Sequence, residues 1–505
     1  MNLFNKTYKR NSAVFLMVAF VSLLGACSSD FLDRVPQGSY TSGNFPYPNG
    51  GGPYDQYINS AYGSLREWNI SVFPFMAAVS VRSDDADKGS TPADGPSVLQ
   101  MDNFTILPSN DLANGLWVGH YNVINNCNIV LNQISTDENK EVASAVKLQA
   151  EAEARFLRGY AYFMMVRLFG RVPIIDKVSS GGSANNIQQS EPAAIYALIE
   201  SDLQFAAANL PFSWDAKFIG RATRGAANGL LAKVYLTQKK WAPAMNTAEI
   251  VINSNQYDLS TPYDKIFSES GENSRESVFE IQATANPTNP TIYGVQYANV
   301  QGVRGTGSWD LGWGFNVPST NLEAAYEAND PRKERTILYS GGTSVYGEQV
   351  PSGLPNPRYN HKVYSNPSIR AAIGNRFGWW MNVRVLRFAD VVLMYAEAAN
   401  ELGKTTEALE KLEMVRARAR NGNNGILPQV TTTDQMELRT AIRQERRVEL
   451  GMEHDRFFDL VRWGIAASTL QAAGKNFNNN RDNLLPIPQT QIDISKGVLT
   501  QNPGY

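Results

Sequence analysis

The feature that most constrains the fold is a long helical periodicity between Ser144 and Phe169. Apolar and small residues recur there at steps of three and four, the spacing that gathers side chains on one face of an α-helix. The pattern ends at Gly170, and the Val-Pro-Ile-Ile that follows favours extended backbone. Because the apolar face of such a helix must be buried against other elements, the pattern predicts a mainly α-helical core.

Two later segments repeat one another as helix pairs, 221–237 with 241–253 and 388–402 with 405–420. Small residues at equivalent positions let paired helices approach closely, as they do in tetratricopeptide repeats. Generic packing of helix hairpins is the alternative for each pair taken alone. An alignment of the two pairs superimposes Ala232 on Ala396, Ala244 on Ala408 and Val251 on Val415. We expect tetratricopeptide-like helix pairs that form one scaffold, interrupted between the pairs and therefore not a tandem solenoid.

The interrupting segment, about 256–380, is dense in Gly, Pro, Asn, Tyr and Trp and has little helical periodicity. It contains short β-prone runs such as 277–282, and a comparable loop-rich patch covers 68–109. Loops carried on a rigid scaffold are the usual location of binding residues. We therefore expect a large excursion of loops and short strands that carries a ligand surface.

Further helices are expected at 192–209, after Glu191-Pro192, and at 434–450. The chain then approaches its end through Leu485-Pro486-Ile487-Pro488. Alternating prolines fix an extended backbone, so this segment is predicted to form a strap over the helices.

The N-terminus has the composition of a secretory signal. Lys6, Lys9 and Arg10 precede an apolar run at 13–24, which is shorter than the about 20 residues that span a membrane. The sequence Leu-Gly-Ala-Cys ending at Cys27 resembles the lipobox of bacterial lipoproteins, in which that cysteine carries a lipid with fatty acyl chains such as palmitate. An ordinary cleaved signal is the alternative. We expect a signal peptide at 1–26, a lipid-anchored spacer at 27–53 and a single domain at 54–505.

Composition excludes several classes of function. The chain has only two cysteines, Cys27 and Cys127, which excludes cysteine-based zinc sites. Removal of the signal leaves 43 basic against 48 acidic residues, without the basic excess that nucleic-acid binding requires. No metalloprotease, nucleophile-elbow, P-loop or dinucleotide motif is present, and no carboxylate pair stands out as a glycosidase pair. We expect no catalysis and no cofactor.

A charged cluster near the C-terminus superficially resembles acid–base machinery. Its spacing instead favours ion pairs on helix surfaces and a network that ties the C-terminal strap to the helix pairs. The cluster comprises Arg443, Glu445, Arg446, Arg447, Glu449, His454, Asp455, Arg456, Asp459 and Arg462.

An ordered series of motifs, together with the lipobox, covers nearly the whole mature chain and resembles the SusD/RagB family of outer-membrane nutrient-binding lipoproteins. The motifs are AEARFLRGYAY at 152–162, LFG at 168–170, RGAA at 224–227, LAKVYL at 231–236, LRFADV at 386–391, YAEA at 395–398, RRVEL at 446–450, RFFDLVRW at 456–463 and QNPGY at 501–505.

The resemblance implies a tetratricopeptide-like helical fold that supports a loop-built ligand surface. It implies a location at the outer membrane, facing the cell exterior, and a partner, a SusC-like TonB-dependent transporter over which the protein sits as a lid. It also implies binding of oligosaccharide or polysaccharide, or of peptide in some members, without chemistry on the ligand. A helical-repeat scaffold that binds only proteins is the alternative.

The excursion supplies the first group of candidate ligand residues. Sugar rings present C–H patches to aromatic faces and hydroxyl groups to polar side chains, and this stretch combines both kinds of residue. An alternative for the two tryptophans is burial as anchors of the excursion. The candidates are Tyr293, Tyr297, Arg304, Trp309 and Trp313.

The loop-rich patch supplies a second group, Trp68, Phe73 and Asp84. Asp84, Asp85 and Asp87 offer carboxylates for a structural calcium ion, but the EF-hand pattern is absent and a solvated turn is favoured. Of the adjacent Trp379 and Trp380, at most one is expected to face a ligand, because side chains alternate in extended backbone. Trp117 is expected in the core.

Overall fold

Long helices packed side by side dominate the computed structural model. The structure describes residues 51–138, 142–178, 186–284, 286, 288–289 and 293–505. The predicted signal peptide, the lipid attachment at Cys27 and the spacer as far as residue 50 lie outside the described residues. Residues from Tyr54 onward, apart from 139–142, form one compact unit. None of the described helices combines the length and the apolar composition needed to cross a membrane.

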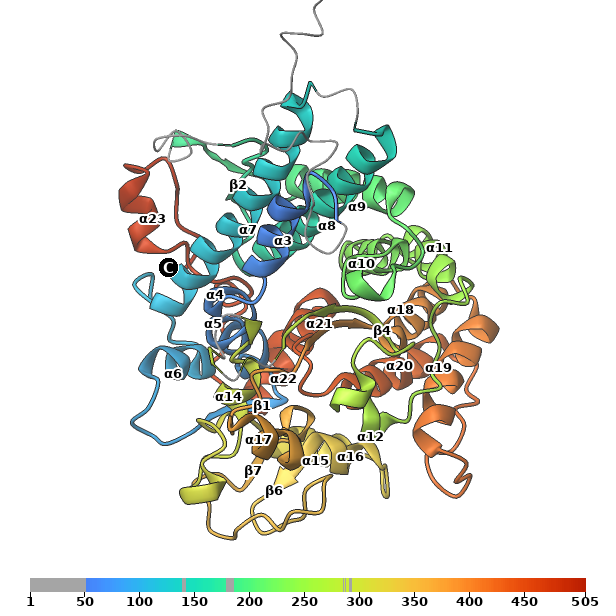
Figure 1. Ribbon diagram of the computed structural model, residues 1–505. Helices are drawn as coiled ribbons and strands as arrows, with labels where there is room; N and C mark the ends of the chain where they lie inside the picture. Colours follow the sequence, from blue (N-terminus) through green and yellow to red (C-terminus); the bar gives the residue numbers. More distant parts are fainter. Residues whose placement is uncertain (1–50, 139–141, 179–185, 285, 287, 290–292) are drawn as a thin grey trace, which may run out of the picture. The chain divides into compact units, whose positions relative to one another are not determined.

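The scaffold is a row of helices in which each packs against the next. The row runs through α7 (Asp111–Thr136), α8 (Ser144–Phe169), α9 (Pro192–Asn209), α10 (Arg224–Thr237) and α11 (Trp241–Ile252). It continues from α11 directly onto α18 (Phe388–Glu401), α19 (Thr405–Arg420) and α20 (Gln435–Leu450). In Figure 1, green α10 and α11 lie beside orange α18 and α19. The row interrupted in sequence is therefore continuous in space, and the predicted mainly α fold is confirmed.

The two helix pairs use small residues where they meet. Ala232, Ala244, Ala396 and Ala408 are fully buried, as the alignment of the pairs predicts. Alanine adds no side chain beyond Cβ, so helices that meet at alanines pack closely and bury each other's apolar faces.

The predicted helix boundaries hold to within about three residues. α8 and α19 have the predicted limits, whereas α10 begins at Arg224 because the Thr223 side chain accepts a hydrogen bond from the Ala226 N–H and caps the helix. Asp434 caps α20 in the same way, by accepting from the Met436 and Glu437 N–H groups.

Helix α7 is 26 residues long although it contains glycines and asparagines, which favour helix poorly. Two of these glycines serve packing. A Cβ at Gly115 would lie 2.7 Å from the Asn69 Oδ1, and one at Gly119 would lie 2.9 Å from the Ile70 Cδ1. The glycines thus let α4 (Trp68–Ser71) lie close against α7. Tertiary packing outweighs helix propensity here.

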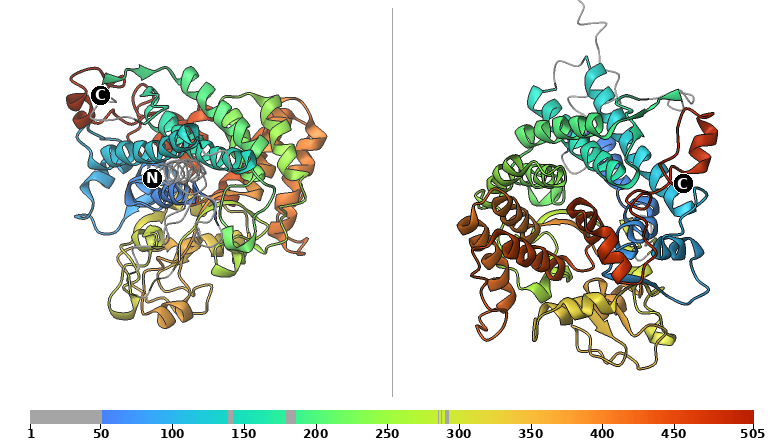
Figure 2. Two further views of the ribbon diagram at one scale, coloured as in Figure 1. Left: turned by 45° about the horizontal axis from the view of Figure 1, so that its top comes forward. Right: turned by 180° about the vertical axis from the view of Figure 1, so that it is seen from behind.

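Strand pairing closes the excursion at its base. β4 (Ser277–Ile281) pairs antiparallel with β8 (Val383–Arg387), so the chain leaves and re-enters the scaffold side by side. β1 (Ala86–Gly89) pairs with β5 (Phe315–Pro318), and β6 (Ile337–Tyr339) pairs with β7 (Arg358–Asn360). β2 (Val172–Pro173) pairs with β3 (Gln189–Ser190). The expected excursion of loops and short strands is confirmed, and it appears in yellow in both views of Figure 2.

Short helices occupy both loop-rich regions, including the patch at 68–109 that was expected to be irregular. They and the remaining helices are α3 (Asp55–Ser64), α5 (Phe73–Met76), α6 (Pro96–Asn103), α12 (Tyr263–Ile266), α14 (Tyr297–Gln301), α15 (Thr320–Ala325), α16 (Arg332–Thr336), α17 (Pro367–Ile373), α21 (Arg456–Trp463), α22 (Ala466–Ala472) and α23 (Gln489–Ile494).

The C-terminal strap lies on the end of α8. The Leu485 N–H donates to the Leu168 carbonyl at 2.7 Å, and the Asn502 amide donates to the Phe169 and Leu485 carbonyls at 2.9 and 2.8 Å. Leu485 and Ile487 are fully buried. All four residues of Leu485-Pro486-Ile487-Pro488 are buried, as predicted for a strap that lies over the helices.

Candidate functional site

Three of the predicted ligand residues come together on one surface. The ring centroids of Trp68 and Phe73 lie 5.6 Å apart, and the Trp313 ring lies 5.7 Å from Trp68 and 6.3 Å from Phe73. Trp313 is 38 % exposed, whereas Trp68 and Phe73 are partly buried. We call these three residues the aromatic platform. Two segments that are far apart in sequence build it together.

Strand pairing explains why the two segments meet. Gly89 of β1 lies opposite Phe315 of β5, and the Ser90 N–H donates to the Gly314 carbonyl at 2.6 Å. Phe315 is 5 % exposed and its ring lies 4.8 Å from that of Phe73. The buried Phe315 thus supports Phe73, which in turn packs against the exposed Trp313. A ring held on both sides loses little entropy on binding.

A second aromatic pair adjoins the platform through Asn299. The Trp313 N–H donates to the Asn299 carbonyl at 2.9 Å, and the Trp379 Nε1–H donates to the Asn299 side-chain oxygen at 2.9 Å. Phe377 stacks on Trp379 with a centroid distance of 6.0 Å and an interplanar angle of 21°. Trp380 is buried, so at most one of the adjacent tryptophans is available to a ligand, as expected.

Polar groups beside this pair were not found by sequence reasoning. Arg376 lies over the Phe377 ring at 4.8 Å and pairs with Asp310 at 2.7 Å, and both charged side chains are about half exposed. The signal that pointed to this region was the Trp379–Trp380 doublet, but the residues just before it carried no pattern of their own.

Two further predicted residues lie on accessible surface. Arg304 is one-third exposed and pairs with Asp94 at 2.7 Å, while donating to the Ser90 Oγ at 2.8 Å. Hydrogen bonds from Thr91 and Ser90, with the Arg304 charge, lower the pKa of Asp94. Tyr293 is 47 % exposed. Both side chains have surface to offer a ligand.

The prediction that Asp84 contacts a ligand is wrong, because its side chain is buried. It is 3 % exposed, and its two carboxylate oxygens accept hydrogen bonds from Arg456 at 2.8 and 2.9 Å. Arg447 adds a second ion pair at 2.9 Å and also binds Asp85, which is 2 % exposed. Burial alone would raise the pKa of Asp84, but Arg456 and Arg447 lower it. The expected solvated turn is therefore wrong for these two aspartates, and Asp84 is not available to a surface ligand.

Tyr297 and Trp309 also differ from the prediction. Tyr297 is 9 % exposed and its hydroxyl is hydrogen-bonded to the His454 Nε2. Trp309 is partly buried against a core cluster that includes Val303 and Leu311. Of the two tryptophans of the excursion, Trp309 is thus an anchor of the segment, whereas Trp313 lies at the surface where a ligand could reach it. Trp117 is 4 % exposed and belongs to the core, as expected.

The charged cluster is a buried network, not a set of helix-surface pairs. Glu445, Arg446 and Glu449 are at most 2 % exposed. Arg446 joins α20 to α18 through Asp390 at 2.8 Å and to α21 through Asp459 at 3.2 Å. The network therefore ties helices to one another, whereas hydrogen bonds from the Leu485 N–H and the Asn502 side chain to backbone carbonyls hold the strap.

The three histidines lie in the interior of the protein. His120, His361 and His454 are buried, and burial lowers the pKa of each, to about 4, 3 and 3. Within the described ranges, no group of three or more His, Cys, Asp or Glu side chains is placed to hold a metal ion.

Comparison with known proteins identifies relatives over most of the chain. The family model described as "SusD family" matches residues 275–505, and the one described as "Starch-binding associating with outer membrane" matches residues 76–236. The chain is 30 % identical to SusD-like protein P2 of Formosa agariphila over 485 residues, which cover 89 % of this chain and 91 % of that protein. It is 28 % identical to a SusD-like protein of Bacteroides ovatus, over 89 % and 82 % of the two chains.

Solved structures agree with the sequence relatives. A laminarin-binding SusD-like protein superposes with a TM-score of 0.76 at 28 % identity, covering 90 % of this chain and 99 % of that one. Surface glycan-binding protein A of Bacteroides thetaiotaomicron, solved in complex with laminarihexaose, superposes with a TM-score of 0.74 at 25 % identity, covering 89 % and 98 % of the two chains. The fold is thus that of SusD-like glycan-binding proteins, and the chain belongs to the SusD (SusD/RagB) family.

Proposed function

We propose that this protein captures oligosaccharide or polysaccharide at the cell surface and passes it to a SusC-like TonB-dependent transporter, over which it acts as a lid. The observation that carries the binding role is the convergence of Trp68, Phe73 and Trp313 into one partly exposed platform. Such rings accept the C–H face of a sugar, and their mutual packing fixes them before the ligand arrives. Arg304, Tyr293, Arg376 and Trp379 adjoin the platform or lie exposed, and are proposed to contact hydroxyl groups. The ligand would be bound and not chemically changed.

Relatives support the choice of ligand class. Their names include a laminarin-binding protein and the starch-binding protein SusD of Bacteroides thetaiotaomicron, which is 30 % identical over 29 % of this chain. Affinity electrophoresis against laminarin, starch, xylan and mannan, with protein lacking the first 27 residues, tests the proposal. We expect retardation by at least one polysaccharide. Retardation by none, with tight binding of a peptide, would replace glycan by peptide and leave the capture role intact.

A matched pair of variants tests the platform itself. Trp313→Ala removes an exposed ring and is expected to weaken glycan binding at least about 30-fold, the loss of a hot-spot aromatic. Phe212→Ala is the control, because Phe212 is also an exposed aromatic (55 %) but lies between α9 and α10, outside the platform. Equal affinities of the two variants would show that the platform does not bind the ligand.

The partner and the location need separate tests. Copurification with the transporter is expected to survive Trp313→Ala, because glycan and transporter would use different contacts. Loss of the transporter complex without loss of glycan binding would favour a scaffold that binds only proteins. Lipid attachment at Cys27 is tested by palmitate labelling, and Cys27→Ala is expected to abolish the label and release the protein from the membrane. Protease accessibility on intact cells reports which face carries the protein.

A further inference from the structure

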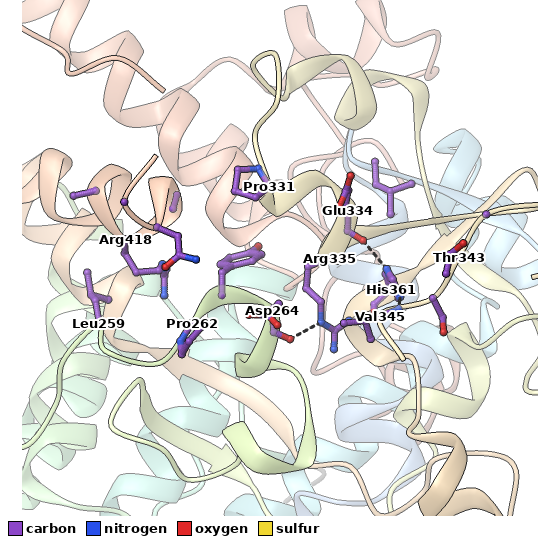
Figure 3. A pocket seen from close by; sticks show the side chains of 18 of the residues that line it. Leu259, Pro262, Asp264, Pro331, Glu334, Arg335, Thr343, Val345, His361 and Arg418 are labelled. Atoms are coloured by element: carbon purple, nitrogen blue, oxygen red, sulfur yellow. Dashed lines mark hydrogen bonds between the residues drawn. The ribbon is translucent and has the colours of Figure 1, made fainter. Parts of the chain in front are cut away.

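A hollow in the described part of the chain lies away from the aromatic platform. It is a cavity of about 850 Å³ between α12, α16, β6 and the C-terminal end of α19. Its volume falls in the range of roughly 300–1,000 Å³ that is typical of small-molecule sites. None of the residues that line it belongs to the platform. Figure 3 shows it from close by.

Two buried side chains hold the walls of this cavity in place. The Arg335 guanidinium donates to the Asp264 carbonyl at 3.0 Å, to the Phe267 carbonyl at 2.9 Å and to the His361 carbonyl. The His361 Nδ1–H donates to the Glu334 carbonyl at 2.6 Å, and the Nε2 accepts from the Val345 N–H at 3.0 Å. Arg335 and His361 are 2 % and 3 % exposed. Five wall residues are thus fixed relative to one another, so the cavity is pre-formed.

The same hydrogen bonds position two carboxylates. Asp264 and Glu334 are the residues whose backbone carbonyls are held, as the dashed lines of Figure 3 show. Their side chains are exposed. The Asp264 carboxylate is 49 % exposed and has one ion pair, with Lys265 at 2.9 Å. Glu334 is exposed as well. Two carboxylates on a fixed backbone are strong hydrogen-bond acceptors that remain open to a ligand.

The cations of the cavity are already occupied. Arg335 donates to three backbone carbonyls, and Arg418 pairs with Glu449 and with Glu276. An anionic ligand would therefore meet two exposed carboxylates and two guanidinium groups that already have partners, with only the Arg418 Nε and Nη1 lacking a hydrogen bond. A cationic ligand would approach two buried guanidinium groups. The remaining walls combine apolar side chains, such as Leu259, Ile337 and Val345, with polar ones, such as Ser260, Thr343 and Asn421.

We propose that this cavity is a second carbohydrate site, which takes the end of a neutral saccharide chain, from one to a few sugar residues. The proposal rests on the proposed function for its ligand class. The carboxylates of Asp264 and Glu334 accept the sugar hydroxyls, and the apolar side chains of the walls receive the C–H faces. The two sites differ in shape, because the platform supports an internal stretch of chain whereas the cavity encloses a chain end. Together they give the protein two contacts with one polysaccharide, which raises its avidity.

Equilibrium dialysis of the full-length protein in detergent with radiolabelled laminaritriose, maltotriose, xylotriose and mannotriose counts the bound molecules per chain. We expect two molecules of at least one trisaccharide for the wild type. Ala417→Trp fills the cavity from α19 and is expected to leave one. Glu410→Trp is the matched control, because Glu410 lies two turns earlier on the same helix, is exposed and does not line the cavity, so two molecules should remain.

Further variants separate the two sites. Trp313→Ala should also leave one molecule, and the double variant with Ala417→Trp should leave none. In the Trp313→Ala background, Glu334→Gln is expected to weaken the remaining site about tenfold, because a charge-assisted hydrogen bond becomes a neutral one.

Three different results would overturn one or both proposals. A count that Ala417→Trp leaves unchanged would overturn the cavity site alone. A count that Trp313→Ala leaves unchanged while Ala417→Trp lowers it would overturn the platform and leave the cavity. Absence of binding to all four trisaccharides would overturn both.

Discussion

Charged and aromatic residues often mark functional sites, and two regions of the molecule are rich in them. In one region the charged side chains are buried in ion pairs, whereas in the other an aromatic ring is exposed to solvent. Around Arg387, which is 2 % exposed, Glu276 and Glu449 lie at 2.7 and 3.0 Å in a closed ion network. The aromatic platform instead leaves Trp313 38 % exposed. The network contains Arg387 and Glu449 of the LRFADV and RRVEL motifs and is buried, whereas no platform residue belongs to a motif and Trp313 is open to solvent. In this fold the recognisable sequence preserves the scaffold, and the proposed ligand surface is assembled from short helices and a loop of the excursion.

The largest change in stability is expected when one carboxylate of the buried ion network is removed. Glu449 is fully buried and accepts hydrogen bonds from Arg387, Arg332 and Arg418. Glu449→Ala leaves these charges partly unpaired and should lower the free energy of unfolding by about 3–5 kcal/mol. Urea denaturation measures it, with Glu410→Ala on exposed α19 surface as the control. A loss below about 1 kcal/mol would mean that the network is not required for stability.

The fold could be predicted from the sequence more fully than the candidate site could. Helices α8 and α19 were predicted with their limits because the spacing of apolar residues is local information. Asp84 was misassigned because its partner Arg456 lies far along the chain, so the sequence around Asp84 shows only a polar loop. The meeting of Trp68 with Trp313 was likewise invisible, since it depends on the pairing of β1 with β5. Residue types marked candidates, but pairings distant in sequence decided which of them reach the surface.

The second prediction concerns Asp84. The sequence suggested this residue for the ligand surface, but it is buried in ion pairs like the residues of the network. If its role is structural, Asp84→Ala should lower the free energy of unfolding by about 3 kcal/mol, the cost of a broken buried ion pair. The glycan affinity of the folded protein should remain that of the wild type, because the carboxylate is buried beneath the surface. Thermal unfolding and affinity electrophoresis on the same sample separate the two effects. A stable variant with lost affinity would restore Asp84 to the ligand site.

A smaller change in stability, which depends on pH, is expected at His454. Its buried side chain contacts Tyr297 of α14 and Phe75 of α5. Its Nε2 is hydrogen-bonded to the Tyr297 hydroxyl, its ring contacts Phe75, and burial lowers its pKa to about 3. The unfolded chain takes up a proton at this position below about pH 6.5, while the folded protein does not. Stability is therefore lost as the pH falls from 6.5, by about 2 kcal/mol at pH 5 for this group.

His454→Asn removes this proton uptake and keeps a residue that tolerates the positive φ of 73° at this position. Urea unfolding at pH 8, 6.5 and 5 should show a flatter pH dependence for the variant than for the wild type. The difference between the two slopes is the relevant quantity, because Glu153 and Glu272, whose pKa values are raised by burial to about 7, act in the opposite direction. Identical slopes would show that His454 does not titrate on unfolding as described.

The smallest expected effect tests how far the ligand surface extends beyond the platform. Arg376 pairs with Asp310 and lies over the Phe377 ring, and its side chain is 50 % exposed. Arg275 forms a similar pair with Asp258 and is 53 % exposed, but it belongs neither to the platform nor to the Phe377–Trp379 stack. Surface pairs of this kind contribute about 0–1 kcal/mol, so neither Arg376→Ala nor Arg275→Ala should change stability much. Only Arg376→Ala should weaken glycan binding, by about threefold, because its loss also frees the Phe377–Trp379 stack beside Trp313. If the two variants bind glycan equally well, the ligand surface ends at Trp313. The open surface that contrasts with the buried network then consists only of the three rings of the platform.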